Sequence, residues 1–308
     1  MCATCGCSEG ARATLSDPAT GRVVGIGAPE HESRDHEHEH VHGHDHVHDH
    51  EHSPTHDHEY GHGHEHGHTH DHEGGPAHIH GGHTRGTTVS VLEDVLAKNN
   101  RLAERNRGWL EGRSILALNL VSSPGAGKTT LLERTIRDLK SAISISVVEG
   151  DQETMLDAER IRATGCKSVQ VNTGTGCHLE AQMLARALKE LDPPARSLVM
   201  IENVGNLVCP ALFDLGEHAK VVIFSVTEGA DKPLKYPHMF HASSLMILNK
   251  MDLLPHVDFD VSACIAHARR VNPDIEVLQV SSTRGDGLEG WYTWLRERLA
   301  ICRVEAAL

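Results

Sequence analysis

The sequence predicts an α/β fold, in which a doubly wound, mostly parallel sheet follows a disordered, histidine-rich N-terminal region. Three observations support this prediction. From residue 84 onward, short apolar runs alternate with helical patterns, as in strand–helix–strand units. Several of these runs are continuous and rich in β-branched residues, which is typical of strands buried on both faces. Between residues 31 and 83, histidine alternates with Asp, Glu and Gly, and such a composition cannot bury an apolar core.

The expected elements follow in chain order. A helix is predicted over 87–110, with Ser90 as its cap and with Val91, Val95 and Leu102 near one face. A second helix, over 131–140, follows the first strand. The predicted strands span residues 115–121, 143–148, 197–201, 221–226, 245–248 and 276–280.

Composition narrows the class of protein. The chain has 308 residues, 39% hydrophobic but only 3% aromatic, so the core must be built from aliphatic side chains. The net charge is −14, and the 12 acidic residues between 31 and 83 account for most of it. The rest of the chain carries no basic stripe, so we expect no nucleic-acid partner. No apolar run is long enough to span a membrane, and no secretory signal is visible, so a cytoplasmic location is expected.

Three zones divide the chain. Residues 1–30 carry three of the eight cysteines, 31–83 carry 21 of the 27 histidines, and 84–308 form the globular part. In a reducing compartment the cysteines are expected to be thiols, which makes them candidate metal ligands or core residues. We therefore predict a cysteine-rich metal-binding segment, a disordered metal-binding tract and one folded domain.

A phosphate-binding loop follows the first strand of the globular part. It resembles the P-loop pattern GxxxxGK[ST], with Ser122 in place of the first glycine. Backbone N–H groups at the start of a helix would cradle phosphates, Lys128 would reach the β- and γ-phosphates, and Thr129 would bind Mg²⁺. The alternative is a Gly/Ser-rich turn that merely opens a helix. The expected nucleotide contacts are Gly125, Ala126, Gly127, Lys128, Thr129 and Thr130.

A second motif indicates which base is bound. Asn249, Lys250 and Asp252 follow a predicted strand and match the NKxD pattern of GTPases. The Asp252 carboxylate can accept hydrogen bonds from both N1–H and the exocyclic amino group of guanine, a pair that adenine lacks. Ser281 lies where GTPases place a loop behind the base, although an ordinary turn would show the same residues. The motif predicts that the nucleotide is GTP.

Acidic residues at two strand ends are candidates for Mg²⁺ and hydrolysis. Glu202 and Gly205 fit the DxxG pattern of a switch segment with Glu for Asp, so Gly205 would contact the γ-phosphate and Glu202 the Mg²⁺ through water. Asp151 is either a second Mg²⁺ partner or a helix N-cap. With Lys128 and Thr129, these carboxylates are the predicted catalytic residues. The sequence shows no clear catalytic glutamine or arginine, so intrinsic hydrolysis should be slow.

Two groups of residues suit a soft or borderline metal ion. Cys2, Cys5 and Cys7 place three thiols within six residues, and thiolates bind Ni²⁺, Zn²⁺ and Cu⁺. The imidazoles of the histidine tract suit the same class of divalent ions, and we interpret the tract as a metal store rather than a plain linker. Its composition does not distinguish nickel from zinc.

A third group of candidate metal ligands would couple metal binding to the state of the bound nucleotide. Cys177 and His178 follow a Gly-rich turn at the start of a predicted helix, and Cys209 lies four residues past Gly205, within the expected switch segment. A ligand there would move with the element that the γ-phosphate rearranges. The alternatives are a core cysteine at 209 and a surface histidine at 178.

Taken together, these motifs resemble the nickel-inserting GTPases of hydrogenase maturation, the HypB family. The resemblance covers residues 1–7 and 84–308, and rests on the segments 121–125 (VSSPG), 149–151 (EGD), 176–181 (GCHLEA), 202–210 (ENVGNLVCP) and 228–237 (EGADKPLKYP). It implies a G domain that dimerises on binding GTP and a tight nickel site at Cys2, Cys5 and Cys7. It also implies an interface site for Ni or Zn at Cys177, His178 and Cys209. The implied partners are a zinc-containing accessory protein and the large subunit of a [NiFe] hydrogenase.

Three other classes of protein remain open at this point. The related urease nickel GTPases share the P-loop, but the cysteines of residues 2–7 and the segment 202–210 argue against them. A metal-storage protein would use its G domain only to regulate release. A zinc-handling GTPase would show a preference of the Cys177 site for Zn²⁺ over Ni²⁺.

Overall fold

The computed structural model describes residues 14–16, 23–25, 84–151 and 156–305. Contacts divide the chain into one unit of residues 1–28 and 86–308 and another of residues 29–85. The first of these units is described below. The histidine tract and its predicted disorder lie outside the described residues, as do Cys2, Cys5 and Cys7. The boundaries of the three predicted zones therefore stay predictions. Among the described helices, none is long and apolar enough to cross a membrane.

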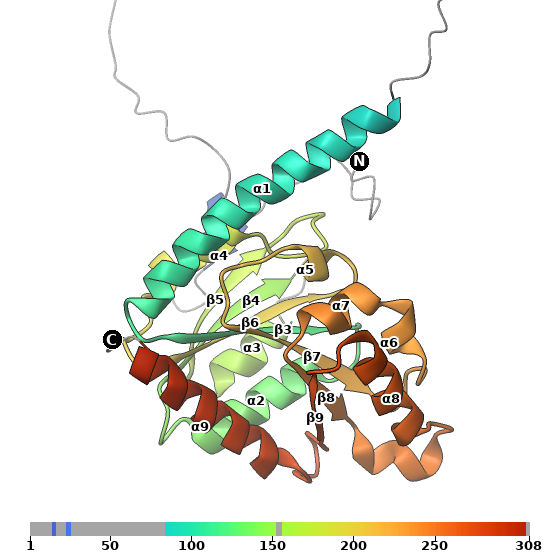
Figure 1. Cartoon of the computed structure of the whole chain (residues 1–308). Helices are drawn as coiled ribbons and strands as arrows, with labels where there is room; N and C mark the ends of the chain where they lie inside the picture. The colour runs from blue at the N-terminus through green and yellow to red at the C-terminus, as the bar shows by residue number, and fades with distance from the viewer. Residues whose placement is uncertain (1–13, 17–22, 26–83, 152–155, 306–308) are drawn as a thin grey trace, which may run out of the picture. The chain divides into compact units, whose positions relative to one another are not determined.

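A nine-stranded sheet organises the described fold, in the order β2-β1-β5-β4-β6-β3-β7-β8-β9 (Figure 1). The strands from β5 to β9 in this order pair in parallel, whereas β1 pairs antiparallel with both β2 and β5. The bounds are Thr14–Ser16 (β1), Val23–Gly25 (β2), Leu116–Ser122 (β3), Ile145–Asp151 (β4), Lys167–Asn172 (β5), Leu198–Gly205 (β6), Ala219–Ser225 (β7), Leu245–Asn249 (β8) and Glu276–Gln279 (β9). The predicted doubly wound, mostly parallel α/β fold is confirmed.

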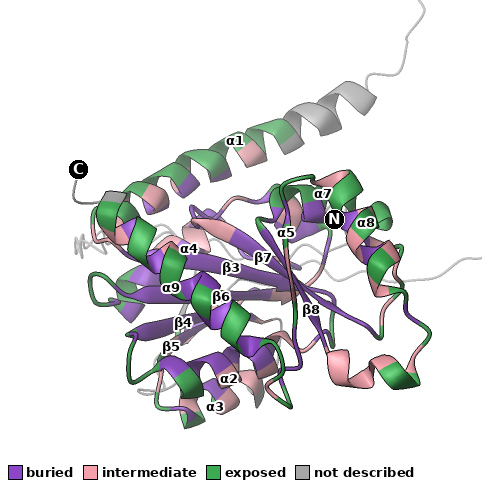
Figure 2. Ribbon diagram, turned by 60° about the horizontal axis from the view of Figure 1, so that its bottom comes forward, coloured by how far each residue is buried: buried purple, intermediate pink, exposed green. Residues whose placement is uncertain are grey.

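Helices cover both faces of the sheet, which is why the central strands are buried along their length (Figure 2). Side chains from α2 and α9 pack on one face, and side chains from α1, α4, α7 and α8 pack on the other. The helices are Thr84–Glu111 (α1), Lys128–Leu139 (α2), Leu156–Ala163 (α3), Ala181–Leu191 (α4), Cys209–Leu212 (α5), Lys232–Lys235 (α6), Pro237–Ala242 (α7), Val261–Val271 (α8) and Leu288–Glu305 (α9), with a 3-10 turn at Met251–His256 (η1).

The six predicted strands correspond to β3, β4, β6, β7, β8 and β9, with ends that differ by a few residues. Strand β5 was not predicted. Four of the six residues in its sequence, KSVQVN, are polar, and only Val169, Gln170 and Val171 are buried. Such a strand shows no continuous apolar run, so a search for fully buried strands passes over it.

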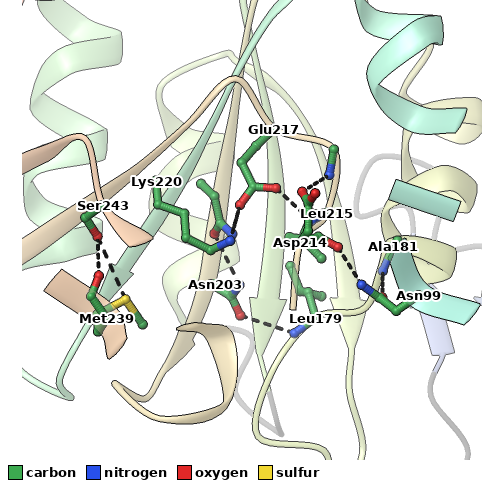
Figure 3. A network of polar contacts seen from close by, with 12 residues as sticks. Asn99, Leu179, Ala181, Asn203, Asp214, Leu215, Glu217, Lys220, Met239 and Ser243 are labelled. Atoms are coloured by element: carbon green, nitrogen blue, oxygen red, sulfur yellow. Dashed lines mark hydrogen bonds and ion pairs between the residues drawn. The ribbon is translucent and has the colours of Figure 1, made fainter. Parts of the chain in front are cut away.

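The prediction for the first helix was wrong in its start and in its cap. Helix α1 begins at Thr84, so Ser90 lies inside it and is not its cap. Val95 is 44% exposed, whereas Asn99 and Asn106 are buried. The Asn99 side chain donates to the Asp214 carbonyl and accepts from the Ala181 N–H (Figure 3). Asn99 and Asn106 lie on the same face of the helix as Val95 and Leu102, so the predicted face is kept, but two of its buried contacts are made by amides.

Candidate functional site

The loop between β3 and α2 has the backbone that phosphate binding requires. Gly125 and Gly127 have φ angles of +75° and +96°, a region that favours glycine. A Cβ on Gly127 would lie 2.5 Å from Asn249 Nδ2, so this position has no room for a side chain. Lys128 begins helix α2, and the open N–H groups of that helix face the loop. The loop therefore fits a phosphate group.

This loop forms one wall of a cavity of about 540 Å³. The opposite wall comes from the carboxyl ends of β4 and β6, where open parallel sheets bind their ligands. The lining residues are 122–130 of the loop, Glu149, Gly150, Asp151, Asp157, Arg160, Glu202, Asn203, Val204, Gly205 and Lys250. All the predicted phosphate-contact residues thus surround one cavity, and Asp151, Glu202 and Gly205 join them.

Glu202 connects the two walls of the cavity. Its Oε1 accepts hydrogen bonds from Lys128 Nζ at 2.8 Å and Thr129 Oγ1 at 2.6 Å, while its buried Oε2 has no partner among the described residues. A hydroxyl next to an unsatisfied carboxylate oxygen supplies the hard oxygen ligands that Mg²⁺ prefers. These residues therefore fit a nucleotide-bound Mg²⁺, with Thr129 and Glu202 as the groups nearest to it.

A second carboxylate, Glu149, lies beside Glu202 because the two residues are register partners on adjacent strands. Burial, and then the charge of Glu202, raise the pKa of Glu149 from 4.5 to about 8. Asp151 is the last residue of β4 and half-buried. Residues 152–155 are outside the described residues, and α3 begins only at Leu156, so the alternative role of Asp151 as an N-cap stays untested.

The predicted base-contacting residues lie close to the phosphate loop. Asn249 Nδ2 donates to the Ala126 carbonyl at 3.0 Å, and Lys250 Nζ donates to the Gly125 carbonyl at 2.6 Å. Lys250 itself takes a left-handed conformation, with φ of +61°. Ser281 Oγ donates to Asp252 Oδ1 at 2.6 Å, which orients the carboxylate expected to contact guanine. Loops that are far apart in sequence are therefore assembled into one candidate base site.

Gly205, at the end of β6, touches the phosphate loop from the other side. A Cβ at this position would meet Pro124 Cα at 3.2 Å and Pro124 Cγ at 3.3 Å. The strand end therefore approaches the loop as closely as glycine allows, which places the Gly205 backbone in the cavity.

Cys177, His178 and Cys209 converge at the same edge of the sheet. Their ligand atoms all lie within 4.8 Å of one another. Cys177 and His178 lie in the loop between β5 and α4, and Cys209 is the first residue of α5, shortly after β6. Helix α4 begins at Ala181, so Cys177 and His178 precede it by a few residues, at the end of the Gly-rich turn. We call these three residues the metal cluster.

The surroundings of His178 suit a metal ligand. Its ring lies 4.0 Å from the ring of Phe213, and its buried Nε2 has no hydrogen-bond partner among the described residues. Burial lowers the pKa of His178 to about 4, so the imidazole is neutral at pH 7, the form that binds metals. Two thiols and one imidazole form a donor set for Ni²⁺ or Zn²⁺.

Two asparagines join the metal cluster to the nucleotide cavity. Asn203 Oδ1 accepts from the Leu179 N–H at 3.2 Å, and Asn206 Nδ2 donates to the Cys177 carbonyl at 3.4 Å. Gly150, which lines the cavity, packs so closely that an added Cβ would meet Leu179 Cγ at 2.7 Å. The loop that carries Cys177 and His178 is therefore held by residues of the cavity wall and of the segment following it.

The other cysteines of the described residues lie elsewhere. Cys166 precedes β5, while Cys264 on α8 and Cys302 on α9 are buried in the core. Burial raises the pKa of the Cys166 and Cys264 thiols to about 12, so neither is a thiolate at neutral pH.

Several residues of the cavity were not predicted. Arg160 lines it from α3, next to Asp157, and its NH2 donates to Thr130 Oγ1 at 3.2 Å and to Glu133 at 2.8 Å. Asp157 and Arg160 are three residues apart and therefore lie on one face of that helix. Only this spacing could have suggested that the two side chains act together. Glu149 and Asn203 sit inside apolar strands, and nothing in the sequence marks their burial.

Fold and site define a class: a P-loop nucleotide-binding protein of the GTPase type, with a thiol–imidazole cluster beside its phosphate pocket. Residues 116–279 match the family model for the CobW/HypB/UreG nucleotide-binding domain. Over 227 residues the chain is 58% identical to the hydrogenase maturation factor HypB of Azotobacter chroococcum mcd 1. This matched region covers 74% of each chain. The chain belongs to the HypB family of hydrogenase maturation factors.

Two solved structures agree with this assignment. The crystal structure of HypB from Archaeoglobus fulgidus is 41% identical, with a TM-score of 0.62 over 66% of this chain and 99% of the other. HypB from Helicobacter pylori, crystallised in complex with nickel, is 38% identical, with a TM-score of 0.62 over 66% of this chain and 95% of the other.

Proposed function

We propose that this chain is a GTP-hydrolysing nickel metallochaperone that stores Ni²⁺ and delivers it to the large subunit of a [NiFe] hydrogenase in the cytoplasm. The observation that carries this proposal is the shared edge of the sheet. Strand β6 contributes Glu202 and Gly205 to the nucleotide cavity, and the segment that follows it contributes Cys209 to the metal cluster. One continuous stretch of chain therefore lines the candidate nucleotide cavity and carries a ligand of the candidate metal cluster.

In the nucleotide site, each residue has a role that its position supports. Residues 125–130 bind the phosphates, and Asn249, Lys250, Asp252 and Ser281 bind guanine. Mg²⁺, when bound, would neutralise charge on the phosphates, and Thr129, Glu202 and Asp151 are the residues placed to hold it. Lys128 would leave its ion pair with Glu202 and contact phosphate oxygens instead. Arg160 lies at the same cavity and adds positive charge there.

The metal ion held by the metal cluster is, in this proposal, a substrate to be delivered and not a resident cofactor. Cys177, His178 and Cys209 supply three ligands, and the nickel complex of the Helicobacter pylori relative supports nickel as the ion. Zn²⁺ suits the same donors. Cys2, Cys5 and Cys7 and the histidine tract add further binding capacity in our proposal, as the storage part of the chain.

Nucleotide-dependent dimerisation would complete the metal site. Val208 and Leu212, on either side of Cys209, are 42% and 38% exposed. A second copy of the chain packed on this face would cover them and could supply further ligands. A zinc-containing accessory protein would then receive nickel and pass it to the hydrogenase subunit.

The proposal is tested by measuring the delivery of nickel to a nickel-free hydrogenase subunit. Nickel-loaded protein is incubated with GTP, the accessory protein and a nickel-free hydrogenase large subunit, and nickel in the subunit and released phosphate are measured together. We expect both to require GTP and to be lost in Lys128→Ala. A matched control, Lys140→Ala, changes a lysine at the end of α2 away from the cavity and should behave as the wild type. Delivery that proceeds equally with GDP would contradict the proposal.

A further inference from the structure

A second cavity, of about 420 Å³, lies between helices α1 and α4 (Figure 1). Its lining carries a net charge of +3, in a chain whose net charge is −14. The charged lining residues are the basic Arg105, Arg113, Arg186 and Lys189 and the acidic Asp192. Because Arg105, Lys189 and Asp192 are exposed, the cavity opens to solvent, and we call it the basic groove. It shares no lining residue with the nucleotide cavity and contains no member of the metal cluster.

Trp109 gives the basic groove an apolar surface. The other two tryptophans of the chain, Trp291 and Trp294, are buried, whereas Trp109 is half-buried: it packs against the core and also lines the groove. The guanidinium carbon of Arg113 lies 4.7 Å from the centroid of the Trp109 ring. Tryptophan and arginine are enriched among the residues that contribute most to binding at protein interfaces. The groove therefore has the composition of a protein-binding hot spot.

The positive charge of the basic groove is only partly neutralised. Asp192, the one acidic residue of the lining, accepts from Arg113, with 3.3 Å between Oδ1 and Nη2. Arg105 and Lys189 make no ion pair within the part of the chain that the structure describes. Arg105 lies one helical turn before Trp109 on α1, and Lys189 faces the groove from α4. Negative groups of a ligand would therefore find cations on two sides of an aromatic surface.

We propose that the basic groove is a docking site for a partner protein that presents a short acidic segment with an apolar side chain. The apolar side chain would pack on Trp109, and carboxylates beside it would pair with Arg105 and Lys189. A ligand made only of phosphates would leave the tryptophan uncovered, and a nucleic acid would need a longer basic stripe.

The position of the basic groove gives such docking a consequence. Asn106, which lines the groove, donates from Nδ2 to the carbonyl of Ala181 at 2.8 Å. Ala181 is the first residue of α4 and lies three residues after His178 of the metal cluster. The partner would thus bind the helix that follows the metal-cluster loop and leave the nucleotide cavity open. The proposal itself does not depend on nickel or GTP binding.

The test measures binding of defined peptides to the reduced full-length protein, without metal or nucleotide. The probe is a dye-labelled peptide of about ten residues, in which two leucines are flanked by glutamates and aspartates, and its anisotropy is followed at low salt. In one comparison peptide lysines replace the acids, and in another serines replace the leucines. We expect the acidic leucine peptide to bind at least about tenfold more tightly than either, because it alone offers both charge and apolar area.

Variants locate the binding on the protein. Arg105→Glu/Lys189→Glu changes two exposed side chains and should weaken binding about tenfold, since attraction becomes repulsion at two positions. The matched control, Arg269→Glu/Arg270→Glu, reverses two exposed charges at the end of α8 and should bind as the wild type does.

A change of the aromatic residue tests the apolar contact separately. Peptide binding should alter tryptophan fluorescence in the wild type, and Trp109→Phe should lose this change although Trp291 and Trp294 remain. Trp109→Ala should weaken binding about tenfold or more. Its thermal unfolding is measured alongside, because Trp109 also packs against the core. If Trp109→Ala does not fold, the charge reversals and the fluorescence of Trp109→Phe still decide.

The acidic residues between 31 and 83 could compete with the peptide. All measurements are therefore repeated in a full-length chain in which these residues are changed to Asn or Gln. Tighter peptide binding in that chain would support a site for acidic segments.

Four results would overturn the proposal. The first is no binding of the acidic leucine peptide to either chain at about 1 mM, a very weak affinity. The second is equal weakening by the α8 control, which would mean unspecific charge attraction. The third is unchanged binding in Arg105→Glu/Lys189→Glu. The fourth is tripolyphosphate or a single-stranded oligonucleotide that binds the groove more tightly than the peptide, which would indicate a phosphate or nucleic-acid ligand instead.

Discussion

Asn203 accepts a hydrogen bond from the backbone N–H of Leu179, and this contact joins the wall of the nucleotide cavity to the loop that bears the metal cluster. Asn203 lies directly after Glu202 on β6, and Leu179 directly after His178. The amide of Asn203 also donates to Asn119 Oδ1, and Asn119 donates to Glu217, which pairs with Lys220 (Figure 3). Because every member of this chain of contacts is buried, a shift of β6 must displace the loop or break a hydrogen bond.

Replacing Asn203 should uncouple the two sites. In Asn203→Ala, the Leu179 N–H and the Asn119 side chain lose a buried partner, so we expect about 1–3 kcal/mol lower stability against urea. GTP and nickel should still bind, but the effect of a GTP analogue on nickel affinity should shrink. Asn272→Ala is the control, since Asn272 also makes hydrogen bonds to backbone, to the Phe240 and Ser243 carbonyls, but lines neither the cavity nor the metal cluster. If the GTP analogue changed nickel affinity as much in Asn203→Ala as in the wild type, this prediction would be contradicted.

Cys209 should be required for metal binding but not for nucleotide binding. In a chain that also carries Cys2→Ser, Cys5→Ser and Cys7→Ser, we expect Cys209→Ala to abolish the thiolate–nickel absorption of the cluster and to leave GTP affinity within about twofold. The reason is that Cys209 supplies one of three ligands but does not line the cavity. Cys264→Ala, which removes a buried cysteine from α8, is the control. An unchanged nickel stoichiometry in Cys209→Ala would show that the cluster is not the site.

Glu149 should make the stability of the metal- and nucleotide-free protein depend on pH. Its pKa is about 8 in the folded chain against an ordinary value of 4.5, so between these values the folded state binds one more proton than the unfolded state. Stability should therefore fall as pH rises through this window, by about 1.4 kcal/mol per pH unit for this group. Glu149→Gln should lose that slope in urea titrations, whereas Glu159→Gln, at an exposed position on α3, should keep it. Parallel pH profiles for the two variants would refute the assignment.

Asp252 should determine which base is bound. A carboxylate accepts two hydrogen bonds from guanine, whereas xanthine presents a carbonyl where guanine has an amino group. We expect Asp252→Asn to lose GTP affinity by about 1.5–3 kcal/mol, the value of a hydrogen bond to a charged group, and to gain affinity for xanthosine triphosphate. Competition with a fluorescent guanine nucleotide measures both. Asp258→Asn, on the loop beyond η1, serves as the control; similar losses in both variants would contradict a base-reading role.

The fold and the local motifs were predictable because they depend on short stretches of sequence. The P-loop needs glycine at positions such as Gly127, where a side chain has no room, and buried parallel strands need continuous apolar runs. Both requirements can be recognised directly in the amino-acid sequence. Cys177 and Cys209 were also proposed together, since Cys209 falls within the expected switch segment and Cys177 lies at a Gly-rich turn beside a second metal-binding side chain, His178.

The remaining features depend on contacts between distant residues, which leave no local trace. Asn99 and Asn106 bury their amides against backbone carbonyls that are more than 70 residues away, so these contacts of α1 could not be predicted from the local sequence. Arg160 enters the cavity only because α3 packs against α2. The raised pKa of Glu149 follows from its burial and then from its register with Glu202 on the adjacent strand, and no spacing in the sequence reports either.

The central claim is that the nucleotide state sets the metal affinity of the cluster. The most direct test measures nickel affinity of the reduced protein, with Cys2, Cys5 and Cys7 changed to serine, by thiolate–nickel absorption in the presence of GDP or of a non-hydrolysable GTP analogue. Oligomer mass is determined on the same samples. We predict that the analogue drives dimerisation and changes nickel affinity about 5- to 150-fold, a typical coupling between two sites. Equal nickel affinity in both nucleotide states would contradict the account and leave a nickel-binding protein whose GTPase serves another purpose.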